Sequence, residues 1–398
     1  MSVWDDLVGQ DQVVEQLVSA AQGARTVVAG EATGASGMTH AWLFTGPPGS
    51  GRSTAARAFA AALQCTSPDI DLGGVPGCGF CDGCHTALIG SHADVNTVRT
   101  DGLSIGVKET RELVRNASMS PAGRRWQVII IEDADRLTEG AANVLLKAIE
   151  EPAPRTVWLL CAPSVEDALP TIRSRCRLLV LRSPAVGAVA DVLMRRDGVD
   201  PELAAFAARA SQGHIGRARR LAQDESVRAR RAEVLKLPLT VGDLGACLAG
   251  AQALVDAATA EAKQVAEEVD AKETEELRAA LGAAAGVGGR MPRGTAGAMK
   301  ELEDRQKRRA TRIQRDSLDL ALLDLAGFYR DVLAVQFGAG GGLSNEDLRS
   351  GVERLASQST PEATLRRIES VLACRDAIER NVAPLLAVEA MTVALRAG

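Results

Sequence analysis

Short apolar runs alternate with longer helical stretches between residues 40 and 181. Four of these runs have the length and composition of buried strands, namely residues 41–45, 128–131, 157–162 and 178–181. Strands separated by helical segments are typical of a parallel sheet with helices on both of its faces. The pattern therefore predicts an α/β domain over residues 1–182.

The rest of the chain has the spacing of helices. Beyond Pro184, short segments rich in Ala, Leu and Arg predict a small helical domain over 183–237. Apolar residues then recur at helical spacing, at Leu318, Leu322, Leu325, Tyr329 and Val332 and again at Leu365, Ile368 and Leu372. These stripes predict an all-helical domain over 238–398, in which they form core or helix-packing surface.

A change of composition interrupts this third domain. Acidic residues cluster from 267 to 276, a run rich in Gly and Ala follows, and a basic run ends at residue 315. A Gly-rich stretch between blocks of opposite charge predicts a flexible insertion over 267–315. Its basic run could contact DNA, or it could form a solvated helix face that pairs with nearby Glu and Asp.

Composition agrees with a helix-rich α/β protein. The 398 residues are too many for one ordinary core, and the low aromatic content of 3% favours helices over sandwiches or barrels. The formal net charge of −5 means that any contact with DNA comes from a local basic surface. The sequence begins without the pattern of an export signal and contains no long uncharged apolar run, so we expect a cytoplasmic protein with no membrane partner.

A glycine-rich loop, GPPGSGRS at residues 46–53, lies between an apolar strand and an Ala-rich helix. This context is typical of a phosphate loop, whose glycines allow backbone N–H groups to surround phosphate oxygens. The candidate nucleotide-binding residues here are Gly46, Gly49, Gly51, Arg52, Ser53 and Thr54.

Arg52 replaces the lysine of the usual phosphate-loop motif. Arginine keeps the positive charge, but its planar head does not occupy the same point between phosphates as an ammonium. We therefore expect that ATP or ADP can bind, with Mg²⁺ only when a nucleotide is present, and that hydrolysis is inefficient. The alternative, a loop that keeps its shape for packing alone, stays open.

The second candidate strand, residues 128–131, is followed by a reversed pair of acids, Glu132 and Asp133. In a working ATPase of this kind Asp comes first and holds Mg²⁺, and the following Glu polarises the attacking water. Glu132 extends its carboxylate one methylene farther than an Asp would, and Asp133 reaches one methylene less far than a Glu would. A misplacement of about 1 Å can cost ~10²-fold in rate. The pair thus also predicts poor hydrolysis.

Four cysteines are spaced to surround one ion: Cys65, Cys78, Cys81 and Cys84. Four thiolates predict a structural Zn²⁺ site with no coordination position left open for water. An iron–sulfur cluster and redox-active thiols are the alternatives, and His85 and His92 are nearby but not needed as ligands. The other four cysteines, at 161, 176, 247 and 374, are expected to be buried small hydrophobic residues.

The segment from Thr138 to Pro152 predicts a helix that begins after an N-cap at Thr138 and ends before the proline. Together with the phosphate loop and the cysteines, its string NVLLKAIEEP at 143–152 resembles the AAA+ clamp-loader subunits of bacterial DNA polymerase III. The resemblance covers nearly all of the chain except the insertion. It implies a P-loop (AAA+ RecA-like) domain with a zinc module at about 65–84, a helical lid domain and an all-α collar domain, with the 143–152 helix near primed DNA.

The string TIRSRC at 171–176 matches a Ser-Arg-Cys motif of that family. The resemblance implies that Arg175 is a catalytic arginine finger, which enters the ATP site of a neighbouring subunit and stabilises charge on the transferred phosphoryl group. The alternative is an interface or surface arginine that pairs with a carboxylate.

Two branches of the family carry the zinc module, the ATP-hydrolysing gamma/tau subunits and the delta prime subunits. Arg52, the reversed acids and Gly216, in the place of an arginine that senses the γ-phosphate, favour the delta prime branch, although Arg217 is one residue away. The C-terminal residues 379–390 also resemble that branch. The alternatives are a gamma/tau-like ATPase and a zinc-stabilised nucleic-acid binder with a vestigial loop.

The resemblance also implies the partners. They are the gamma/tau and delta subunits in a hetero-pentamer, the sliding clamp, and primed DNA through the assembled complex. The chain is then expected to be part of a DNA-directed DNA polymerase holoenzyme, without being a polymerase or an efficient ATPase itself.

Overall fold

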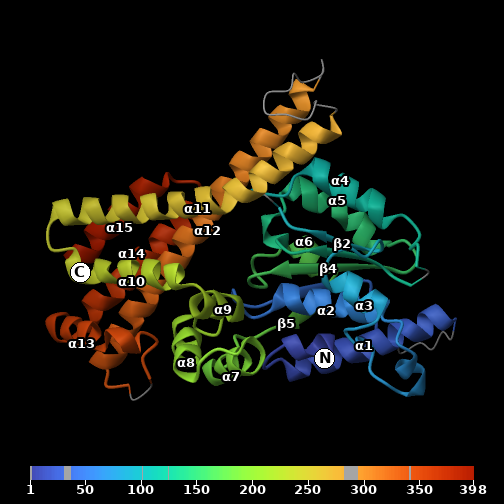
Figure 1. Ribbon diagram of the computed structural model, residues 1–398, viewed down its shortest axis with the longest axis horizontal. Coiled ribbons are helices and arrows are strands. Elements are labelled where there is room, and N and C mark those ends of the chain that lie inside the picture. Colours follow the sequence, from blue (N-terminus) through green and yellow to red (C-terminus); the bar gives the residue numbers. More distant parts are fainter. Residues whose placement is uncertain (1, 31–36, 101, 124, 282–294, 340–341) are drawn as a thin grey trace. The chain divides into compact units, whose positions relative to one another are not determined.

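The computed structural model describes residues 2–30, 37–100, 102–123, 125–281, 295–339 and 342–398 (Figure 1). The chain divides into two compact units, Met1–Arg219 and Arg220–Gly398. We refer to them as the amino-terminal and carboxy-terminal units. The first contains the predicted α/β domain and most of the predicted lid, so the division into three domains at 182 and 237 stays a prediction.

The amino-terminal unit is built on one parallel sheet of five strands in the order β2-β3-β4-β1-β5. The strands are β1 (Ala41–Thr45), β2 (Val95–Val98), β3 (Gln127–Ile131), β4 (Thr156–Ala162) and β5 (Arg177–Val180). Four of them confirm the predicted strands to within one residue at each end. The sequence pattern missed β2, because this edge strand has only four residues and two polar positions.

Alternate side chains of the sheet face two helical layers, as the pleat requires. One face contributes Trp42 and Phe44 to a core shared with α1 (Asp11–Ala29) and α2 (Arg52–Gln64). The other face contributes Leu43 and Trp158 to a core shared with α4 (Val107–Ala117) and α5 (Glu139–Glu150). Figure 1 shows these two layers on opposite sides of the sheet. Burial on both faces explains why the central strands are continuous apolar runs.

The helix α5 begins as the sequence predicted. The Thr138 hydroxyl accepts a hydrogen bond from the backbone N–H of Ala141 at 3.2 Å, and the helix ends at Glu150, two residues before Pro152. The remaining helices described in this unit are the 3₁₀ segments Val3–Asp6, Pro68–Leu72 and Ala134–Arg136, then α3 (Asp82–Leu88), α6 (Pro170–Arg173), α7 (Val186–Asp197), α8 (Pro201–Ala210) and α9 (Ile215–Gln223). The boundary between the two units falls within α9.

Within its described residues, every secondary-structure element of the carboxy-terminal unit is a helix. Its elements are α10 (Glu225–Thr240), α11 (Leu244–Ala280), α12 (Ala296–Gln336), a 3₁₀ segment Glu346–Leu348, α13 (Arg349–Gln358), α14 (Pro361–Glu379) and α15 (Pro384–Ala397). The predicted stripe from Leu318 to Val332 lies in its core. None of the helices in the described ranges combines the length and the apolar content that crossing a bilayer requires.

The second predicted stripe is partly wrong. Leu365 and Leu372 on α14 are 44% and 45% exposed, whereas the buried side of that helix carries Val371, Cys374 and Ile378. The helix is therefore rotated by roughly one residue from the predicted orientation. Its apolar residues on the outer side are available to contact another molecule.

The predicted flexible insertion is also wrong where the structure describes it. Residues 267–280 are the end of α11 and 296–315 are the start of α12, and Figure 1 shows these helix ends side by side beyond the other helices of the unit. We refer to residues 259–280 and 296–315 as the arm. The Gly-rich residues 282–294 lie outside the described residues.

Opposite charges explain why the arm is helical. Arg309, whose side chain is 13% exposed, lies 3.1 Å from Asp270 and 2.8 Å from Glu273, and Arg305 also approaches Glu273 at 3.6 Å. The acidic and basic runs thus pair across two helices, which was the alternative to a DNA-binding segment. Burial alone would raise the pKa of Glu273, but the hydrogen bond and charge of Arg309 lower it below its ordinary value.

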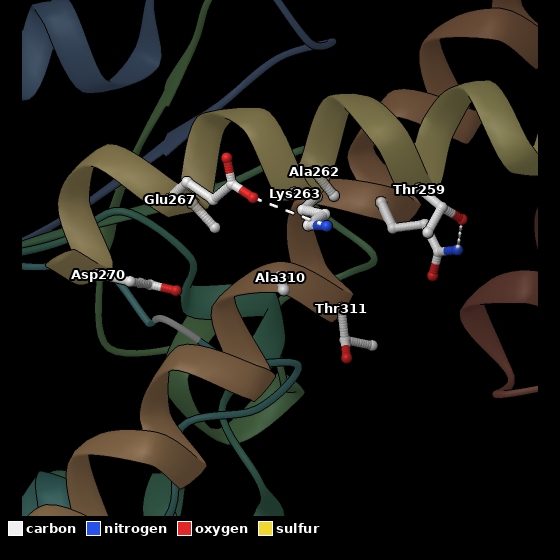
Figure 2. A pocket seen from close by; sticks show the side chains of 9 residues that line it. Thr259, Ala262, Lys263, Glu267, Asp270, Ala310 and Thr311 are labelled. Carbon is white, nitrogen blue, oxygen red and sulfur yellow. Dashed lines mark hydrogen bonds and ion pairs between the residues drawn. The ribbon is translucent and has the colours of Figure 1, made fainter.

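Small side chains where the two helices meet leave an open pocket of about 390 Å³ on the arm. In Figure 2 the Ala262 and Ala310 side chains face this space from opposite helices. Lys263 and Glu267 border it as an ion pair of 3.8 Å along α11. The pocket therefore reflects Ala-to-Ala packing and not a cluster of chemically reactive groups.

We expect Arg309→Ala to loosen the arm by about 1 kcal/mol, because two carboxylates lose a partly buried partner. Hydrogen exchange of peptides from 262–280 and 296–315 measures the effect, with the exposed neighbour Arg308→Ala as a control. Since the folded pKa of Glu273 is lowered, the pairing stabilises the arm above the ordinary carboxyl pKa and is lost as the pH falls through the lowered value. Equal exchange in both variants would contradict this assignment.

A buried polar network lies at the centre of the carboxy-terminal unit. Arg231 on α10 donates to Asp324 on α12 at 3.1 Å and to the Asn345 side-chain oxygen at 2.5 Å. The Asn345 side-chain and backbone N–H groups each donate to Asp331 at 2.8 Å. All four residues are 6% exposed or less. The network thus joins α10, α12 and the segment before α13 through one cation and two carboxylates.

Candidate functional site

The glycine-rich loop connects β1 to α2 at the carboxyl edge of the sheet. Gly49 and Gly51 have φ values of 85° and 92°, a left-handed conformation that side chains rarely adopt. Gly51 is the N-cap of α2, so the first N–H groups of this helix face the loop. Ser53 and Thr54 lie in its first turn. This is the geometry in which a loop and a helix N-terminus receive an anion.

Two of the glycines are required by close packing. A Cβ atom on Gly46 would lie 2.4 Å from the Leu181 carbonyl oxygen, and one on Gly49 would lie 2.4 Å from Cγ of His214. His214 directly precedes α9, so the chain around this helix crosses the tip of the loop. Sequence reasoning had not placed His214 at the loop, because 165 residues separate it from Gly49 and only the folded chain brings them together.

Arg52 turns back onto its own loop. Its Nη1 donates to the carbonyl oxygen of Gly46, and burial lowers the pKa of the guanidinium. Next to it, Ser50 is buried, and its Oγ has no hydrogen-bond partner within the described part of the chain. The loop therefore holds a cation and an unsatisfied hydroxyl close to the helix N-terminus.

The two acids after β3 are engaged by groups of this chain. Glu132 is paired with Arg57 of α2 at 2.6 Å, and its side chain is 8% exposed. Asp133 accepts a hydrogen bond from the backbone N–H of Thr100 at 3.3 Å. Close by, burial raises the pKa of Asp135. Arg57 was not predicted as a site residue, although it lies five residues after Arg52 on the same helix.

Gln10 is a further site residue that the sequence did not indicate. Its side-chain amide donates to the Ser50 carbonyl at 3.2 Å and to the Arg182 carbonyl at 2.6 Å, and its oxygen accepts from the Arg182 N–H at 3.3 Å. Gln10 is 5% exposed. It therefore joins the phosphate loop to the segment that follows β5.

The four cysteines of the predicted module come together. Their sulfur atoms all lie within 4.8 Å of one another, with Cys81 to Cys65 at 3.8 Å and Cys78 to Cys84 at 4.0 Å. A tetrahedral ion with Zn–S bonds of 2.3 Å needs sulfurs about 3.8 Å apart, so this donor set fits Zn²⁺. Backbone N–H groups of Thr66 and Cys81 point at sulfurs at 3.3 Å, which stabilises thiolates.

Cys65 and Cys84 interact strongly. The contact with the Cys84 thiol lowers the pKa of Cys65 to about 4, although burial opposes this, and the same contact raises the pKa of Cys84. Of the other cysteines, 161, 247 and 374 are buried and 176 is half-buried, and burial raises the pKa of Cys374 to about 11. The prediction of buried packing residues is therefore confirmed for Cys161, Cys247 and Cys374, whereas Cys176 is only half-buried.

Arg175 lies between α6 and β5, away from the phosphate loop in sequence. Its Nε donates to Glu150 at the end of α5 at 2.5 Å, and its Nη1 donates to the Thr171 carbonyl at 2.8 Å. The side chain is 35% exposed. In this chain Arg175 is thus a surface residue that pairs with a carboxylate, and it is accessible to a neighbouring molecule.

The helix α9 begins at Ile215, which places Gly216 in its first turn. A Cβ atom on Gly216 would lie 3.4 Å from the His214 ring. Arg217 is 7% exposed, and its backbone N–H donates to His214 Nδ1 at 3.2 Å. The position at which the resemblance predicts a γ-phosphate-sensing arginine is thus occupied by Gly216, in the first turn of α9.

Two family models match the chain. The one described as DNA polymerase III, delta subunit matches residues 30–185, and the one described as its C-terminal part matches residues 314–392. Together these regions cover more than half of the chain. They include the phosphate loop, the cysteines, Arg175 and the helices α13 and α14.

Curated relatives agree with these matches. The chain is 32% identical over 200 residues to the DNA polymerase III subunit delta prime of Bacillus subtilis, which covers 50% of this chain and 59% of that protein. It is 33% identical over 172 residues to the gamma/tau subunit of Mycobacterium tuberculosis, which covers 43% of this chain and 27% of that protein. The chain thus spans less than two thirds of the length of each.

Among solved structures, a DNA polymerase III gamma subunit-related protein from Thermotoga maritima covers 95% of this chain and 99% of its own, at 14% identity and a TM-score of 0.42. The fold described above rests on the strand order and registers of this chain.

Proposed function

Because this chain belongs to the family of bacterial DNA polymerase III clamp-loader subunits, in the delta prime branch, we propose that it helps load the sliding clamp onto primed DNA. Its partners in this proposal are the gamma/tau and delta subunits of a hetero-pentamer. The observation that carries the choice of branch is the loop itself, in which Arg52 is turned onto the Gly46 carbonyl. The chain contributes to the complex by position and not by turnover of its own.

Weak hydrolysis is supported by the charges around the loop. Glu132 stands where a catalytic strand would hold Mg²⁺, but the Arg57 guanidinium neutralises it at 2.6 Å. Binding of the metal would need this ion pair to break. The Arg52 guanidinium is likewise engaged, because it donates a hydrogen bond to the Gly46 carbonyl oxygen. These contacts favour a site that binds a nucleotide poorly or holds it without cleaving it.

The loop nevertheless fits a phosphate group. The unsatisfied Ser50 hydroxyl, the N–H groups of α2 and the Arg52 cation could all contact phosphate oxygens. A bound ATP or ADP would therefore rest on Gly46, Gly49, Gly51, Ser53 and Thr54, with Mg²⁺ near Glu132 and Asp133.

We assign the four-cysteine cluster to a structural zinc ion. Four sulfurs complete the coordination of Zn²⁺, so no position is left for water or substrate. The module fixes the loop between α2 and α3, where Gly83 allows the Gln64 carbonyl to approach to 2.0 Å of a Cβ position. The ion thus acts as a cross-link in a segment with little core of its own.

The zinc assignment makes a direct prediction. The purified chain is expected to contain one zinc ion, measured by elemental analysis, and Cys81→Ser is expected to lose it and to lower the melting temperature. Cys176→Ser is the matched control, because this half-buried thiol lies outside the cluster. Iron in place of zinc, or full zinc content in Cys81→Ser, would contradict the assignment.

Arg175 is proposed as the arginine finger that enters a neighbouring ATP site. Its present partner, Glu150, is 47% exposed, so this ion pair is weak and can be exchanged for contacts with phosphate. The helices α14 and α15 are proposed to join the collar, since Leu365 and Leu372 expose apolar side chains there, and so does Leu386 at 61%.

A gamma/tau-like ATPase is the second candidate, and the identity to the Mycobacterium tuberculosis gamma/tau subunit favours it. An ATPase assay on the isolated chain separates the two. We expect negligible turnover alone, and restored DNA-stimulated ATPase and clamp loading when the chain is mixed with gamma/tau and delta subunits. Brisk hydrolysis by the isolated chain that Arg52→Ala abolishes would overturn the proposal.

A further inference from the structure

Residues 2–10, which we name the strap, run between the cysteine loop and the phosphate loop of the amino-terminal unit. At one end the strap binds the carbonyl groups of Pro76 and Gly77, the two residues before Cys78. The hydrogen bonds come from the Val3 N–H to Gly77 at 2.9 Å, the Ser2 hydroxyl to Gly77 at 3.0 Å and the Trp4 indole N–H to Pro76 at 2.8 Å.

This contact is closely packed. Gly77 has a φ of 102°, and a Cβ atom on it would lie 2.6 Å from Val3 and 3.0 Å from Trp4 Nε1. Val3 and Trp4 are 3% and 7% exposed. The strap is thus fitted to one conformation of the backbone beside Cys78.

At the other end the strap holds the phosphate loop. Gln10 binds the Ser50 carbonyl and both backbone groups of Arg182, as described above. Between the two ends, Arg196 of α7 pairs with Asp6 and donates to the Asp5 carbonyl at 2.8 Å. The strap therefore contacts the cysteine loop, the helix α7 and the phosphate loop within nine residues.

We propose that the strap transmits the order of the cysteine loop to the phosphate loop, with Trp4 and Gln10 as positioning residues. The inference rests on the proposed zinc site, because an ion held by four sulfurs fixes the carbonyls that the strap binds. Without the ion, the cysteine loop gains alternative conformations, and the strap loses its hydrogen bonds to the Pro76 and Gly77 carbonyls. Gln10 then holds Ser50 less firmly, so the phosphate loop opens more often.

Hydrogen exchange of the full chain, followed by mass spectrometry, tests the link. Chelation of zinc is expected to speed exchange in peptides covering 2–10 and 46–52 as well as 65–84. Trp4→Phe, which removes the indole N–H together with the ring that carries it, is expected to speed exchange in 2–10 and 46–52 roughly three- to tenfold while zinc content stays unchanged. Gln10→Ala is expected to affect 46–52 and leave 65–84 unchanged. The exposed Gln12→Ala is the matched control.

Two results would overturn the proposal. Exchange that rises only in 65–84 after chelation overturns it, and so does a phosphate loop that is unaffected by Gln10→Ala. If chelation also speeds exchange in β3, the whole sheet has loosened and the chelation result is not specific to the strap. The variants Trp4→Phe and Gln10→Ala, which keep the metal, then test the link by themselves. A purified chain without zinc would overturn the proposed metal site, and the same two variants would then support or overturn the strap independently.

Discussion

Arg231→Leu is expected to lower the free energy of unfolding of the carboxy-terminal unit by about 3–5 kcal/mol, since it removes the guanidinium that pairs with the buried Asp324 carboxylate. Asp324 loses the hydrogen bond from Arg231 at 3.1 Å, and Asn345, which donates to Asp331, loses its contact with the Arg231 guanidinium. Water cannot replace the guanidinium easily, because all of these residues are buried. This is the largest stability effect that we expect from one substitution.

Urea unfolding of the full chain, followed by circular dichroism, measures this loss, and hydrogen exchange assigns it to α10 and α12. The adjacent Arg230→Leu is the matched control, because Arg230 pairs with Glu261 at 3.5 Å at a partly exposed site and is expected to cost less than about 1 kcal/mol. Adding Asp324→Leu to Arg231→Leu should recover part of the stability. Equal effects of the two arginine substitutions would show that the network is not a stabilising unit.

Arg175→Ala is expected to slow ATP cleavage at the adjoining site of the assembled loader by about 10³-fold or more, the effect of removing an arginine finger. The chain itself should stay folded and assembled, because the contacts of Arg175 within the chain, an ion pair with Glu150 and a hydrogen bond to the Thr171 carbonyl, are exposed. Arg175→Lys should not restore the rate, since an ammonium lacks the planar fork. Single-turnover hydrolysis in the reconstituted complex is the measurement.

Two controls make the Arg175 result specific. Arg173→Ala removes another exposed arginine two residues away, which donates to the Val165 carbonyl at 3.5 Å, and should leave hydrolysis unchanged. Glu150→Gln frees Arg175 from its partner and should not slow the reaction. An assembled complex that keeps full ATPase with Arg175→Ala would remove the finger from the proposed function.

Elements with a strong local signal could be predicted from the sequence. The buried strands, the cap at Thr138 and the four cysteines depend on residues close together in the chain, so composition and spacing were sufficient. The arm was misjudged because its charges were considered segment by segment. Arg309 and Glu273 are 36 residues apart, and their pairing becomes visible only when the two helices are antiparallel neighbours.

The residues of the candidate site could be predicted only where they belong to a recognised sequence motif. The loop glycines and Arg52 follow a known pattern, whereas Gln10 and His214 reach the loop from distant segments. Arg57 pairs with Glu132, which follows a different strand. None of these three contacts is encoded by neighbouring residues in the sequence. The partners of Glu132 and Arg175 were likewise unpredictable, because a carboxylate or guanidinium in sequence does not reveal which charge lies opposite.

The ion pair between Arg57 and Glu132 bears on the weak ATP hydrolysis that we propose for this chain. Restoring lysine at position 52 would supply a phosphate-binding ammonium, but the acid after β3 would still be occupied by a guanidinium from the same helix. Efficient ATP hydrolysis would therefore need changes at position 52, at position 57 and at the reversed acids 132 and 133 together. Under the proposed function, lysine at position 52 alone is therefore expected not to produce rapid ATP hydrolysis, because Arg57 would still neutralise Glu132.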